Sequence, residues 1–88
     1  MLIRSQDKEQ LLNIDSVKTI GICERGKCFA IFIDSLYFIG NYSSREKIIK
    51  VLDMIQEAYC EFMAIRNGDM WCGKESVFQM PEDSEVEV

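Results

Sequence analysis

The chain has 88 residues, of which 48% are hydrophobic, and its formal net charge is −5. This length fits one domain with a modest core, and the hydrophobic fraction argues against wholesale disorder. The absence of histidine removes the commonest general base near neutral pH, and with it the usual serine and cysteine triads. We therefore expect a protein that is not an enzyme and that needs no cofactor.

The first half of the chain predicts a small antiparallel meander. Residues 1–5 are typical of a first strand, and a polar turn and a short apolar segment follow at residues 6–9 and 11–14. Three further strands are predicted at residues 17–23, 28–33 and 36–42, with turn residues between them. Gly26 suits the positive φ that a tight hairpin requires.

The register of these strands follows from the two turns. We take Arg25-Gly26 as the first two-residue loop, which places Cys23 opposite Cys28. With Asp34-Ser35 as the second loop, the faces of the two hairpins agree, because directly opposed residues share a face. The face expected to meet a helix comprises Ile20, Ile22, Phe29, Ile31, Ile33, Leu36 and Phe38. The other face comprises Thr19, Cys23, Cys28, Ala30, Phe32, Tyr37 and Ile39.

This second face is more apolar than a solvated face usually is. Phe32, Tyr37 and Ile39 gather on it by the predicted register. Either the N-terminal strands or the C-terminal segment cover them, or they form a partner-binding surface, including that of a homodimer. We expect the binding surface.

Residues 43–66 predict one long amphipathic helix. Ser43 and Glu46 have the spacing of a capping box at its start, and Asn67-Gly68 is a natural stop. Apolar residues recur at helical spacing along one side. This stripe comprises Ile48, Val51, Leu52, Ile55, Ala58, Tyr59 and Phe62. The expected fold class is therefore α+β, a small antiparallel sheet packed against one long helix in the C-terminal half.

The end of the chain is predicted to be irregular. Residues 76–80 form at most one short strand, which Pro81 ends. Residues 82–88 are predicted to be a flexible acidic tail, so the folded domain covers residues 1–81. No role is predicted for Trp71.

The negative charge lies in the last quarter of the chain. Residues 1–66 are balanced, whereas residues 67–88 carry one basic and six acidic side chains. Without a basic stripe, direct binding to nucleic acid is not expected. The tail is either a solubilising end or an acidic surface for a basic protein partner. The second interpretation assigns Glu82, Asp83 and Glu85 to partner binding.

The spacing of the four cysteines is not that of a metal-binding site. Cys23, Cys28, Cys60 and Cys72 include no C-x-x-C pair, so reduced, metal-free thiols are expected, and a zinc or redox module is the alternative. No leader-like segment or apolar run of membrane-spanning length occurs. We therefore expect a cytoplasmic protein that does not contact the membrane.

Several stretches together resemble a known group of sequences. They are residues 1–6, 12–15, 39–43, 50–56 and 78–83. The chain resembles short open reading frames of phages and other mobile elements of Gram-positive bacteria. This resemblance implies a role inside the host cell, such as an anti-CRISPR inhibitor of a host CRISPR nuclease. The alternative is a homo-oligomeric structural or regulatory phage protein without a foreign target.

Overall fold

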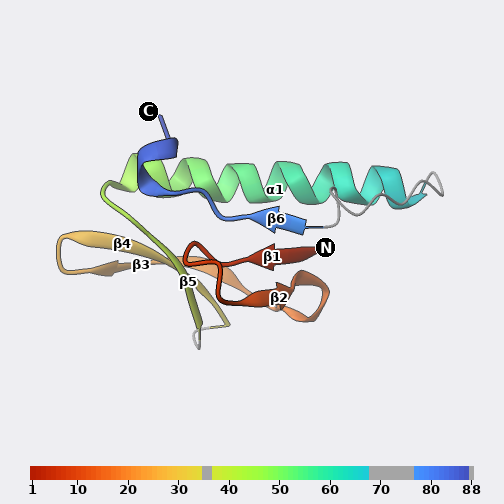
Figure 1. The fold of residues 1–88 in the computed structure, drawn as a ribbon, viewed down its shortest axis with the longest axis horizontal. Coiled ribbons are helices and arrows are strands. Elements are labelled where there is room, and N and C mark those ends of the chain that lie inside the picture. Colours follow the sequence, from red (N-terminus) through yellow and green to blue (C-terminus); the bar gives the residue numbers. More distant parts are fainter. Residues whose placement is uncertain (35–36, 68–76, 88) are drawn as a thin grey trace.

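The structure is a computed structural model that describes residues 1–34, 37–67 and 77–87 (Figure 1). The strands are β1 (Leu2–Arg4), β2 (Leu11–Asn13), β3 (Ile20–Arg25), β4 (Cys28–Ile33), β5 (Tyr37–Tyr42) and β6 (Val77–Gln79). The one long helix of the described part is α1 (Arg45–Asn67), and 3₁₀ turns occur at Ile14–Ser16 and Asp83–Glu85. Figure 1 shows α1 extending across both sheets, with the C-terminal segment beside its first turns.

The strands form two three-stranded sheets. One is the antiparallel meander β3-β4-β5, which packs against α1. The other has the order β2-β1-β6, in which β1 is antiparallel to β2 and parallel to β6. The predicted α+β class is thus confirmed. The second sheet was not predicted, because β6 is only three residues long and reaches β1 from the far end of the chain.

The first hairpin differs from the predicted register by one loop position. Its loop is Gly26-Lys27, since Arg25 pairs with Cys28, and Gly26 takes a φ of +63°. Glycine at the first central position is the pattern of a type II′ turn. Every strand partner therefore shifts by two residues, which preserves the faces. Cys23 now pairs with Ala30, so the predicted Cys23–Cys28 pairing is wrong.

The second hairpin contains a β-bulge that the sequence analysis missed. Phe38 pairs with Phe32 and Gly40 pairs with Ile31, so Ile39 is the extra residue of β5. A bulge turns neighbouring side chains out of strict alternation. Ile39 is consequently buried, with 2% of its surface exposed, whereas Phe38 is 44% exposed. The predicted faces of these two residues are both wrong. The predicted face of Tyr37 is wrong as well, because Tyr37 pairs with Ile33 and therefore lies on the α1 side of the sheet.

Helix α1 begins one residue later than the predicted cap implies. The backbone N–H of Lys47 donates to the Ser44 hydroxyl oxygen (3.2 Å), which makes Ser44 the N-cap. The predicted capping box of Ser43 and Glu46 is therefore wrong.

The core lies between α1 and the two sheets. On α1 the buried residues are Ile48, Val51, Ile55 and Phe62, and Leu52, Ala58 and Tyr59 are partly buried beside them. The sheets contribute Ile3, Ile31, Ile33, Ile39 and Tyr42, and the chain ends contribute Met1, Met80 and Val86. The predicted helix stripe is confirmed, although its centre lies closer to Val51 than to Leu52.

The C-terminal segment is not the flexible tail that the sequence predicted. Residues 82–87 pack on the first turns of α1, and Val86 is buried, with 5% of its surface exposed. The carboxyl oxygen of Glu85 accepts the backbone N–H of Glu82 (2.9 Å). The acidic composition suggested solvation, but the buried valine and the basic residues of the helix hold the segment in place.

Candidate protein-binding surfaces

The residues predicted to bind a partner do not form one site. Phe32 is partly buried, Tyr37 is 50% exposed and Ile39 belongs to the core. Tyr37 pairs with Ile33 and Phe38 pairs with Phe32, so these two exposed aromatic residues point to opposite faces. The acidic residues Glu82, Asp83 and Glu85 lie at the other end of β5, beside the start of α1.

The face of β3-β4-β5 that points away from α1 carries a small aromatic cluster. Phe32 and Phe38 are cross-strand partners, and the Arg25 guanidinium lies 4.4 Å from the centre of the Phe38 ring. The Phe32 ring covers Gly21, since a Cβ added there would lie 2.6 Å from Phe32 Cζ. Ala30 on this face is fully buried. The side chains of this face thus pack on one another.

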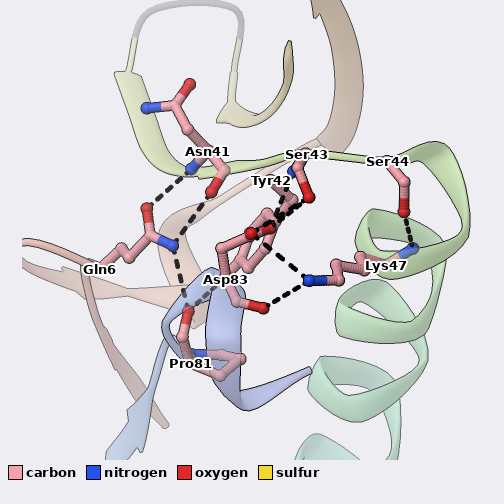
Figure 2. A network of polar contacts seen from close by, with 8 residues as sticks. All are labelled: Gln6, Asn41, Tyr42, Ser43, Ser44, Lys47, Pro81 and Asp83. Atoms are coloured by element: carbon pink, nitrogen blue, oxygen red, sulfur yellow. Dashed lines mark hydrogen bonds and ion pairs between the residues drawn. The ribbon is translucent and has the colours of Figure 1, made fainter. Parts of the chain in front are cut away.

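Asp83 joins the C-terminal segment to the start of α1 (Figure 2). Its carboxylate accepts the backbone N–H of Ser43 (2.8 Å), the Ser43 hydroxyl (3.1 Å) and the Lys47 ammonium (3.4 Å). The Lys47 ammonium also donates to the backbone carbonyl of Asp83 (2.9 Å). The Ser43 N–H, followed by the Ser43 hydroxyl and Lys47, lowers the pKa of the Asp83 carboxyl. This predicted partner-binding residue therefore has structural contacts within the chain.

A second set of contacts joins both sheets to the C-terminal segment (Figure 2). The Gln6 side chain accepts the Asn41 N–H (2.9 Å) and donates to the carbonyl oxygens of Asn41 (3.0 Å) and Pro81 (3.2 Å). The Tyr42 hydroxyl also donates to the Pro81 carbonyl (2.7 Å). Burial, with the nearby carboxylates, raises the pKa of Tyr42, so this hydroxyl stays protonated and can donate at neutral pH. The Gln6 side chain thus occupies the free edge of β5 at Asn41.

We expect Asp83 to make stability depend on acidity. A carboxyl with a depressed pKa in the folded state stabilises the fold above its unfolded pKa, near 3.9, and loses that contribution as the pH falls through the folded pKa. Asp83→Asn should therefore melt at a lower temperature than the parent at neutral pH. The two melting curves should converge as the pH falls below about 4, as measured by circular dichroism. Parallel pH profiles for the two proteins would contradict this assignment.

Helix α1 presents a row of carboxylates to solvent. Asp53, Glu57 and Glu61 are exposed and lie one turn apart, and none of them forms an ion pair within the described part of the chain. Like charges four residues apart cost roughly 0.2–0.5 kcal/mol per pair. Beside the row lies an open groove of about 320 Å³, lined by Met54, Glu57, Ala58, Glu61 and Phe78.

A second open groove lies on the other side of α1, next to β3. Its volume is about 320 Å³, and its lining is almost entirely apolar. The lining residues are Ile14, Ile20, Leu52, Ile55, Gln56 and Tyr59. Leu52 and Tyr59 are partly exposed because they line this groove. The sequence pattern placed them in the core and gave no sign of an opening.

The described residues bring no metal-binding group together. Cys23, Cys28 and Cys60 are free thiols, and Cys72 lies outside the described residues, as does Trp71. Within the described ranges, no cluster of three or more cysteine or acidic side chains has the arrangement of a metal site. Among the same residues, no helix is long and apolar enough to cross a membrane.

Searches of protein-family models, curated proteins and solved structures find no match to the chain. The function must therefore be argued from the surfaces described above.

Proposed function

We propose that this chain is a non-enzymatic acidic module that binds a basic surface of a protein partner. The observation that carries this proposal is the exposed row of Asp53, Glu57 and Glu61 on α1, which has no ion-pair partner in the described part of the chain. A row of like charges destabilises the isolated helix, whereas a cationic partner forms favourable ion pairs with the same carboxylates.

The arrangement of the remaining charges supports the acidic row as the contact surface. Both lysines of the first turns of α1 contact the C-terminal segment, because Lys47 binds Asp83 and Lys50 donates to the Glu87 carbonyl. The exposed side chains of Glu82 and Glu85 add negative charge next to these lysines. The groove along Met54, Ala58 and Phe78 offers an apolar floor for the stem of a long basic side chain.

The partner class follows from the resemblance to mobile-element sequences. A host CRISPR nuclease has a positively charged channel for nucleic acid, and an acidic inhibitor competes for such a surface. The protein then acts in the cytoplasm of the host cell as an anti-CRISPR inhibitor. It uses protein contacts and no direct nucleic-acid binding.

A cleavage assay tests this proposal. The purified chain is added to guide-loaded CRISPR nucleases of Gram-positive hosts, and DNA cleavage is measured at low and at physiological salt. We expect inhibition that weakens with salt, because opposite charges drive the association. The double variant Glu57→Gln/Glu61→Gln should inhibit less, mainly through slower association.

The matched control is Glu9→Gln, which removes an exposed carboxylate far from the row along the chain. This control should inhibit as well as the parent. If no nuclease of the set is inhibited, the CRISPR assignment fails. If inhibition occurs but depends neither on the salt concentration nor on the Glu57→Gln/Glu61→Gln substitutions, the acidic row is not the contact surface.

A further inference from the structure

The groove between α1 and β6 combines an apolar floor with an acidic wall. Met54, Ala58 and Phe78 line it and are partly exposed, and Glu57 and Glu61 line it as fully exposed side chains. Figure 1 shows β6 running alongside the middle of α1, so each element supplies one side of the groove. The volume of about 320 Å³ is near the lower limit of small-ligand pockets, about 300 Å³. The groove therefore has room for one long side chain of a partner.

The lining of the groove is more selective than the carboxylate row alone. Asp53 belongs to the row but does not line the groove, whereas Glu57 and Glu61 do both. A cation that only touches the row forms an exposed ion pair, which is worth little in water. A side chain that enters the groove also removes apolar surface of Met54 and Phe78 from water. The occupant therefore needs both an apolar stem and a cationic end.

Arginine and lysine both have such a stem, but their end groups differ. Glu57 and Glu61 are four residues apart on α1, a spacing that places their Cβ atoms about 5–6 Å apart. The planar guanidinium of arginine has five N–H donors in a rigid fork, so one guanidinium can donate to both carboxylates. It is also weakly hydrated and stacks on aromatic rings, and Phe78 is the aromatic residue of the lining. The lysine ammonium is compact and strongly hydrated, so it matches this lining less well.

We propose that the groove between α1 and β6 binds one arginine side chain of a protein partner. The guanidinium donates to Glu57 and Glu61, and the stem lies against Met54, Ala58 and Phe78. This assignment rests on the function proposed above, since it names the basic group that the acidic module recognises. The partner is then selected by an arginine at one position of its surface, in addition to its positive charge.

Titration with short peptides tests the preference for arginine without any nuclease. The isotope-labelled full chain is titrated at low salt, followed by nuclear magnetic resonance, with a blocked tripeptide that carries arginine between two glycines. This peptide should shift the amide signals of Ala58, Glu61 and Phe78. It should bind about threefold or more tightly than the same peptide with lysine, because only the guanidinium both bridges the carboxylates and stacks on the ring. The peptide with citrulline, which keeps the stem and loses the charge, should leave these signals unchanged.

Matched substitutions test the position of the contact. Glu57→Gln and Glu61→Gln should each weaken binding of the arginine peptide about threefold or more, because each removes one of the two charge-assisted contacts. Asp53→Asn removes the same charge from the same row but lies outside the groove, so it should weaken binding by less than about twofold. Ala58→Gln, which extends a neutral side chain into the groove, should abolish the preference for arginine over lysine. Circular dichroism checks that all four variants are folded.

The outcomes separate this assignment from the function proposed above. Equal binding of the arginine and lysine peptides overturns it, and so do equal losses for Asp53→Asn and Glu57→Gln, although salt-dependent inhibition of a nuclease can still occur. Groove signals that shift with protein concentration alone also overturn it, in favour of a second copy as the occupant. An arginine preference that depends on Glu57 and Glu61 supports the assignment, even if the cleavage assay finds no inhibited nuclease.

Discussion

Replacing Tyr42 with alanine is expected to lower the free energy of unfolding by about 3–5 kcal/mol, as for other large buried aromatic side chains. Tyr42 is 1% exposed and is the largest of the fully buried side chains in the described structure. Its loss removes packing from the core and also the hydroxyl that binds the Pro81 carbonyl (2.7 Å). Because a domain of this size has modest stability, the variant should be close to unfolded at room temperature.

Tyr42→Phe separates the two contributions. The ring remains, and only the hydrogen bond to Pro81 is lost, which costs about 0.5–1.5 kcal/mol. Gln6 still donates to the Pro81 carbonyl, so the oxygen keeps one partner. Urea unfolding followed by circular dichroism measures both variants. Equal losses for the two substitutions would show that the hydroxyl, and not the ring, holds this part of the fold.

Ile55→Ala is expected to cost about 2–5 kcal/mol, whereas Leu52→Ala should cost clearly less. The two residues neighbour each other on α1, but their surroundings differ. Both line the open groove, but Ile55 is only 4% exposed and belongs to the buried core, whereas Leu52 is partly exposed. Truncation of Leu52 to alanine leaves space that water already reaches, so the new cavity lowers the free energy of unfolding only a little. Chemical denaturation of the two variants should therefore give well-separated midpoints. A larger loss for Leu52→Ala would place the centre of the helix stripe elsewhere.

The sequence predicted the elements better than their registers. Strand and helix periodicity located β3, β4, β5 and α1, because each pattern reports the local burial of its own segment. The position of a loop is less constrained, since Arg25-Gly26 and Gly26-Lys27 both place glycine in the turn. The bulge at Ile39 depends on how Tyr42 and Ile39 pack against α1 and the second sheet, and no local pattern records that packing.

The contacts around Asp83 could not be predicted from the sequence for a similar reason. An acidic segment at a chain end is typical of solvated structure, and the two adjacent serines before α1 gave no sign that Ser44 caps the helix while Ser43 binds Asp83. The pairing of Gln6 with Asn41 spans 35 residues and has no sequence signature. The acidic composition did predict surface charge, but it did not reveal that Asp83 is used within the fold.

The place of β1 has a consequence for how the protein is made. Leu2–Arg4 is the central strand of its sheet, and one of its two neighbours is Val77–Gln79, from the opposite end of the chain. Because the meander and α1 lie between β1 and β6 in the chain, they are synthesised before the parallel neighbour of β1 is available. The meander and α1 can therefore assemble first, and the second sheet closes after them. Since distant pairings also slow folding, completion of this sheet should be the late step in refolding experiments.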